Sequence, residues 1–228
     1  MTVSVRVISI GTLATNPLWN EKGAARSGHA TTTLIRTGKR TILVDPGLPD
    51  QALAARLNER SGLKPSDVTD VFLTSFRPDV RRGIRLFEEA DWWVHADERE
   101  AFGVPLAQRL KEAVTSQDPE MKAAMEAEVA LLRRCKPAPD QLAPHVSIFP
   151  LPGITPGLCG LLIEEPRFTT LVCGDAIPTV EHLEQGQVLS PAVSIEQARE
   201  SFAEATEIAD LLVLGRDNMV VNPTKRPF

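Results

Sequence analysis

Cysteine and histidine are scarce in this sequence, which limits the kinds of site it can form. Its 228 residues include three cysteines and four histidines. The cysteines are odd in number, lie far apart and form no Cys-x-x-Cys pair, which argues against a disulfide framework or a cysteine-bound zinc. We therefore expect reduced thiols and a cytoplasmic protein; the three residues concerned are Cys135, Cys159 and Cys173.

Runs of positive charge and long apolar segments are also missing. The net charge is −5 and no basic cluster stands out, so neither nucleic acid nor an acidic membrane is an expected partner. No apolar run approaches the roughly 18 residues that a membrane-spanning helix needs. The opening residues, MTVSVRVISIGT, lack the apolar segment of a signal peptide, and we expect none. A small molecule, another protein or further copies of this chain remain open as partners.

Motifs for nucleotide binding and for serine hydrolases are absent as well. The sequence has no Walker loop, no Gly-x-Gly-x-x-Gly segment and no Gly-x-Ser-x-Gly elbow. A catalytic triad could be assembled from Ser75, His182 and Asp175, but nothing in the local sequence favours it.

Strand-like and helical segments alternate along the chain. Composition and bounding turn residues predict strands at residues 3–10, 31–35, 41–45, 71–74, 92–95, 146–149, 160–164, 168–173 and 211–214. Helices are predicted at 51–60, at 194–209 and, as a helical insert, at about 98–134. Two strand-rich halves with outer helices favour a layered α/β sandwich, in a single domain over residues 1–228.

The helical insert carries an apolar stripe at helical spacing. Its members are Met121, Met125, Val129 and Leu132. Pro119, preceded by a capping aspartate, marks the start of the helix that bears the stripe. We favour packing of this stripe against the core over a groove for a partner.

Five short segments match one known family in order and spacing. The chain resembles the metallo-β-lactamase superfamily, whose members include glyoxalase II-like thioesterases and lactonases. The segments are "ILVDPG" (42–47), "VFLTSFRPDVRRG" (71–83), "ITPGLCGLLI" (154–163), "LVCGDAI" (171–177) and "LLVLGRDN" (211–218). The resemblance implies a four-layer αββα sandwich whose site is built from loops at strand ends.

The same resemblance implies a degenerate metal site. The family uses five histidines and two aspartates, and only Asp79 and Asp175 remain here. The histidine positions hold Ser75, Arg77, Val80, Leu158 and Arg216. Zinc needs three or four nitrogen, sulfur or oxygen donors, so we expect no metal and no other cofactor. We expect a non-catalytic binding or assembly protein; the alternative is a hydrolase of an ester, thioester or lactone with an atypical zinc site.

Two of the substitutions introduce positive charge where the family holds metal ions. Arg77 and Arg216 could neutralise Asp79 and Asp175, which would otherwise face each other as unpaired carboxylates. The planar guanidinium suits this role because it can pair with a carboxylate through two hydrogen bonds. Alternatively, both arginines point to solvent and the aspartates cap local backbone.

Three further residues could approach the pocket of such a fold. His29 and Trp19 lie on the long loop after the first strand, and His182 follows Asp175 by seven residues. Surface or core roles are the simpler explanation for each. If a metal binds after all, its ligands would come from Asp79, Asp175, His29 and His182.

Overall fold

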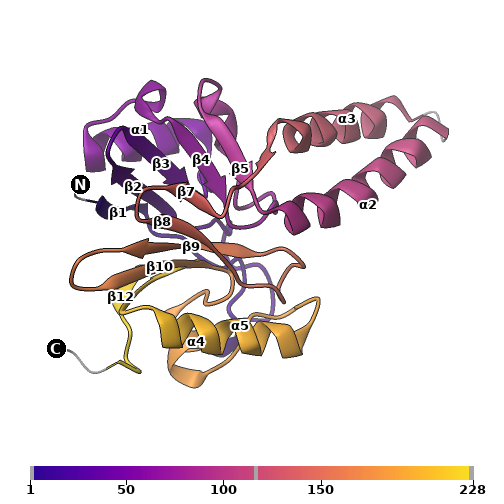
Figure 1. Cartoon of the computed structure of the whole chain (residues 1–228). Helices are drawn as coiled ribbons and strands as arrows, with labels where there is room; N and C mark the ends of the chain where they lie inside the picture. Colours follow the sequence, from indigo (N-terminus) through magenta and orange to yellow (C-terminus); the bar gives the residue numbers. More distant parts are fainter. Residues whose placement is uncertain (1–2, 116–117, 226–228) are drawn as a thin grey trace.

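Two six-stranded β-sheets form the centre of the protein (Figure 1). The structure is a computed structural model and describes residues 3–115 and 118–225. The first sheet contains, in spatial order, β1 (Val3–Ser9), β2 (Thr32–Thr37), β3 (Arg40–Val44), β4 (Asp70–Leu73), β5 (Asp91–Val94) and β6 (Lys136–Pro137). The second contains β12 (Met219–Val221), β11 (Leu211–Leu214), β10 (Thr169–Gly174), β9 (Cys159–Glu164), β8 (Val146–Pro150) and β7 (Gln141–Ala143).

Helices cover the outer faces of the two sheets. The first half contributes α1 (Asp50–Ser61) and the 3₁₀ turns η1 (Pro17–Trp19), η2 (Pro65–Asp67) and η3 (Ile84–Phe87). The second half contributes α4 (Val180–Gln185) and α5 (Ile195–Ile208). The insert forms α2 (Ala96–Thr115) and α3 (Pro119–Arg134), which project together from one side of the molecule (Figure 1).

Three apolar clusters hold the layers together. The central cluster joins Ile42 and Phe72 of the first sheet to Leu161 and Val172 of the second. A second cluster lies beneath α1, and a third lies beneath α5. Each sheet therefore buries one face against the other sheet and one against helices, which gives the expected αββα sandwich.

The sequence predicted most of these elements, with several differences. Asp118 caps α3 by accepting hydrogen bonds from the amides of residues 120 and 121, as expected. The helical insert is confirmed as two helices, although residues 116–117 lie outside the described part. The 3₁₀ turn η3 lies outside the predicted helices. The prediction also missed α4, β12 and the two short strands β6 and β7, which occupy the proline-rich segment 136–144.

The stripe on α3 packs as predicted at its C-terminal end. Leu132 is buried, and Met125 and Val129 pack against the core cluster, whereas Met121 is exposed. Among the described residues, no helix combines the length and apolar character needed to cross a membrane. The single-domain assignment over residues 1–228 stays a prediction.

Candidate functional site

Four loops meet at one edge of the two sheets. Strands β3 and β4 are parallel neighbours in one sheet, and β10 and β11 are parallel neighbours in the other. Parallel neighbours bring their carboxyl ends to the same edge, which is where open α/β sheets bind ligands. Asp45 follows β3, Arg77 and Asp79 follow β4, Asp175 follows β10 and Arg216 follows β11.

The charged residues of these loops form one ion-pair network. Arg216 donates from Nε and Nη2 to the two oxygens of Asp175, at 2.7 and 2.8 Å, and from Nη1 to Asp79 Oδ2 at 2.6 Å. Arg77 donates from Nη1 to Asp175 Oδ2 at 3.0 Å, and its Nε lies 3.8 Å from Asp79 Oδ1. The predicted arginine–aspartate pairing is thus confirmed, and the alternative with both arginines in solvent is wrong.

Burial makes the Arg216–Asp175 pair the centre of this network. Their side chains are 1% and 3% exposed. Burial alone would raise the pKa of Asp175, but the charge and hydrogen bonds of Arg216, followed by the charge of Arg77, hold it below the usual range. Burial would likewise lower the pKa of Arg216, and its two aspartate partners raise it instead. Both groups therefore stay ionised across the physiological pH range.

Asp45 is a second buried carboxyl beside the network. Both of its oxygens accept hydrogen bonds from Thr74, one from the amide at 2.8 Å and one from the hydroxyl at 2.6 Å. Burial raises its pKa to about 7, although the Thr74 hydrogen bonds oppose the shift. The sequence marked Asp45 only as the end of a strand, because burial of its side chain depends on the loops around it.

Glycines let the site loops approach one another. Gly174, at the end of β10, has a φ of +54°, a conformation that residues with a Cβ adopt rarely. A Cβ at Gly215 would lie 2.2 Å from the carbonyl oxygen of Gly174. Small residues at both strand ends therefore allow Asp175 and Arg216 to meet.

Glu98 ties the helical insert to two of the site loops. It lies in the first turn of α2, is fully buried, and accepts hydrogen bonds from the Phe76 amide, the Thr155 hydroxyl and the Gly157 amide. Burial raises its pKa, and these hydrogen bonds oppose the shift. No local pattern indicates this role, since an acidic residue in the first turn of a helix is ordinarily exposed.

The remaining positions of the family's metal site do not fit a zinc ion. Val80 and Leu158 are buried in apolar clusters. Ser75 is buried, and its hydroxyl has no hydrogen-bond partner among the described residues. The Arg216 guanidinium occupies the space between the two carboxylates that would be ligands. Over residues 3–115 and 118–225, no group of three or more histidine, cysteine, aspartate or glutamate side chains could hold a metal.

The histidines proposed for the pocket lie elsewhere. The ring nitrogens of His29 contact the carbonyl oxygens of Ser27 and Ile10, at 3.4 and 3.2 Å. His182 is buried, with Nδ1 2.9 Å from the Thr179 hydroxyl, and burial lowers its pKa. Neither histidine lines the main cavity, which agrees with the surface or core roles favoured from the sequence and not with the possible place in the pocket. The possible four-residue metal set that included them is not assembled.

The structure also places the residues of the disfavoured Ser-His-Asp triad and Trp19 away from any shared arrangement at the main cavity. Because the Ser75 hydroxyl has no hydrogen-bond partner in the described part of the chain and His182 contacts Thr179, the Ser-His-Asp triad does not form. Trp19 is 52% exposed and donates to Glu181 Oε1 at 3.0 Å. It lines a smaller neighbouring cavity of about 200 Å³ rather than the main one.

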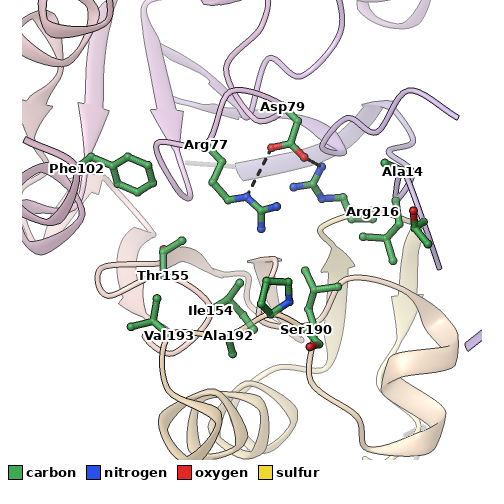
Figure 2. A pocket seen from close by; sticks show the side chains of 14 residues that line it. Ala14, Arg77, Asp79, Phe102, Ile154, Thr155, Ser190, Ala192, Val193 and Arg216 are labelled. Carbon is green, nitrogen blue, oxygen red and sulfur yellow. Dashed lines mark hydrogen bonds and ion pairs between the residues drawn. The ribbon is translucent and has the colours of Figure 1, made fainter. Parts of the chain in front are cut away.

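The main cavity, of about 500 Å³, lies over the ion-pair network (Figure 2). Arg77, Asp79 and Arg216 form its polar side. Mostly apolar residues form the rest, among them Leu13, Phe102, Ile154, Leu189, Pro191 and Val193. A cavity of this size, with apolar walls and a few converging polar groups, has the usual character of a small-molecule site.

Comparisons with known proteins agree with the fold. Residues 26–74 match the family model described as the Metallo-beta-lactamase superfamily. A metallo-β-lactamase-like protein from Thermotoga maritima is 19% identical, with a TM-score of 0.68 over 97% of this chain and 100% of that one. A protein from Staphylococcus aureus described as a metal-dependent hydrolase is 16% identical, with a TM-score of 0.68 over 93% and 88% of the two chains.

A third similar structure contains a bound ligand. It is a variant of AiiA from B. thuringiensis with N-decanoyl-L-homoserine at its active site, 19% identical, with a TM-score of 0.60 over 90% of this chain and 87% of that one. The search of curated proteins found no match. The chain therefore shares the metallo-β-lactamase fold with these solved structures, and the family model matches one part of it, residues 26–74.

Proposed function

We propose that this protein is a non-catalytic binding protein, in which an ion-pair network takes the place of the family's metal centre. The observation that carries the proposal is the buried Arg216 guanidinium, which contacts both Asp175 and Asp79. These are the two aspartates retained at the family's metal positions. Two arginines balance two aspartates, so the network is neutral without a metal.

Electrostatics supports this reading over metal-dependent hydrolysis. A metal ion placed between Asp79 and Asp175 would displace Arg216 and leave a buried cation without its partners, next to added positive charge. An unpaired buried charge costs several kcal/mol. The family's hydrolytic chemistry also needs a metal-bound water of lowered pKa, and no residue at the replaced positions supplies an equivalent group.

The cavity beside the network supports a role in binding. It keeps a volume suited to a small molecule, and Arg77 and Asp79 remain partly exposed on its wall, at 35% and 26%. A cytoplasmic location and the absence of nucleic-acid and membrane partners belong to the same proposal.

Metal analysis combined with a substrate panel tests the proposal. Protein purified without chelator should contain far less than one equivalent of zinc, iron or manganese after dialysis, by mass spectrometry. It should not hydrolyse a panel of esters, thioesters and lactones, with or without added zinc. An equivalent of metal that survives dialysis, with turnover that is lost in Asp79→Asn but kept in the exposed control Asp140→Asn, would establish the hydrolase alternative.

A further inference from the structure

Arg77 and Asp79 present unused hydrogen-bonding groups to the main cavity. The 3.8 Å between Arg77 Nε and Asp79 Oδ1 is longer than a hydrogen bond. Across the residues that the structure describes, Arg77 Nη2 and Nε and Asp79 Oδ1 make no hydrogen bond. Both side chains line the cavity and are partly exposed (Figure 2). The cavity wall thus offers a charged donor and a charged acceptor side by side.

Arg216 differs from Arg77 in this respect. Its Nε and Nη2 donate hydrogen bonds to the two oxygens of Asp175, and its Nη1 donates to Asp79 Oδ2. Its side chain is 1% exposed. The same Nε/Nη2 edge of Arg77 makes no hydrogen bond within the described residues, although its Nε lies within ion-pair distance of Asp79 Oδ1. This edge matches the two oxygens of a carboxylate. Arg77 is therefore the residue of the network that can bind a carboxylate from the cavity.

Charge balance selects the rest of the ligand. The two arginines and two aspartates sum to zero, so a simple anion would meet Arg77 but would also lie beside the negative charge of Asp79. A simple cation would pair with Asp79 but would also lie beside the positive charge of Arg77. A zwitterion satisfies both partners, and in an α-amino acid the ammonium and carboxylate groups are joined through one carbon, which suits two adjacent partners.

The walls of the cavity indicate which kind of side chain the zwitterionic ligand carries. Phe102 from α2, together with Ile154 and Val193 from the second half of the chain, provides apolar surface opposite the network (Figure 2). Leu189 also lines the cavity. Burial of an apolar side chain against such a wall contributes about 25 cal/mol per Å² of area removed from water. The 500 Å³ cavity has room for a ligand of this size.

We propose that the cavity binds an α-amino-acid zwitterion with an apolar side chain. Its carboxylate accepts hydrogen bonds from Arg77, its ammonium donates to Asp79 Oδ1, and its side chain packs against the apolar wall. This inference rests on the proposed binding function, since it assigns the ligand of that same cavity.

Calorimetric titration with a small matched panel of ligands tests the inference. L-Leucine and L-phenylalanine should bind metal-free protein. N-Acetyl-L-leucine lacks the ammonium, L-leucinamide lacks the carboxylate, and glycine lacks the apolar side chain. Each should bind about tenfold more weakly or worse, because a charge-assisted hydrogen bond or the apolar contact is lost. Octanoate and hexylamine complete the panel as a simple anion and a simple cation.

Variants locate the site. Arg77→Gln and Asp79→Asn should each lower affinity for leucine about tenfold or more, whereas Arg36→Gln and Asp140→Asn, at exposed positions, should not change it. Circular dichroism melts establish that each variant folds. If Arg77→Gln does not fold, Arg77→Lys takes its place, because lysine keeps the charge but lacks the paired guanidinium N–H donors that bind a carboxylate.

The outcomes separate this inference from the proposed function. Equal binding of leucine and its capped forms, or equal affinity of Arg77→Gln and Arg36→Gln, overturns the zwitterion site. Binding of octanoate or hexylamine without leucine also overturns it, while leaving a metal-free binding protein. Metal-dependent turnover of the hydrolase panel overturns the proposed function itself.

Discussion

Replacing Asp175 by alanine tests the buried ion pair directly. The change removes both acceptors of the Arg216 Nε and Nη2 donors and leaves that guanidinium, 1% exposed, with Asp79 alone. Breaking one partner of a buried pair typically costs about 3–5 kcal/mol. Arg77 adds little to this cost, because its side chain is 35% exposed and can turn to water. A loss of this size is a large part of the roughly 5–15 kcal/mol that stabilises a typical domain.

Urea denaturation followed by circular dichroism measures this loss. We expect a lower midpoint for Asp175→Ala with an unchanged slope, and a melting temperature lower by roughly 2–4 °C for each kcal/mol. The control Asp140→Ala, at an exposed position, should stay within about 0.5 kcal/mol of the wild type. The double variant Asp175→Leu/Arg216→Met should be more stable than Asp175→Ala, because neither buried charge remains unpaired.

Two results would refute this reasoning. A loss below about 1 kcal/mol for Asp175→Ala would be the value of an exposed ion pair and would contradict the burial of the network. Alternatively, wild-type turnover on the ester, thioester and lactone panel that disappears in Asp175→Ala, with an unchanged melting temperature, would make Asp175 a catalytic residue. It would overturn the non-catalytic assignment.

Two further predictions concern the surroundings of this pair. Burial raises the folded-state pKa of Asp45 from 3.8 to about 7, so the folded state keeps a proton that the unfolded state releases above pH 3.8. The contribution of protonated Asp45 to the free energy of unfolding should therefore be lost as pH rises from 3.8 toward 7, by on the order of 4 kcal/mol in total. The stability of the wild type relative to Asp45→Asn, from urea denaturation, should fall by roughly 3 kcal/mol between pH 5 and pH 8, because part of the loss already occurs between pH 3.8 and pH 5. Comparing the wild type with Asp45→Asn cancels the opposite contribution of His182, whose pKa is lowered, because both proteins contain His182. A stability difference between the two proteins that is the same at pH 5 and pH 8 would contradict the raised pKa of Asp45. The second prediction is that Gly157→Ala melts at a clearly lower temperature or fails to fold, since its Cβ would lie 1.9 Å from the backbone nitrogen of Glu98. A Cβ at Gly23 has no heavy atom within 4 Å, so Gly23→Ala should have the melting temperature of the wild type. Equal melting temperatures of the two variants would show that α2 does not pack closely against Gly157.

The sequence by itself determined the elements and the outline of the site. Strand β11 has the predicted bounds, and Asp118 caps its helix as expected. Such signals act over a few residues, so they can be read locally. The charge count at the positions that match the family's metal ligands also predicted that Arg77 or Arg216 would pair with an aspartate, because two neighbouring carboxylates need compensating charge.

Only the tertiary structure decided how each charged group is used. Asp79 and Arg216 are 137 positions apart, and Asp45 and Thr74 are 29 apart. Whether a side chain is buried, and which donors surround it, depends on loops from four strands meeting at one edge, and no local pattern encodes that meeting. For this reason the sequence could not show that Arg216 is buried while Arg77 faces the cavity. The same reason explains the raised pKa of Asp45 and the distance of His29 and His182 from the site: each depends on burial by residues remote in sequence.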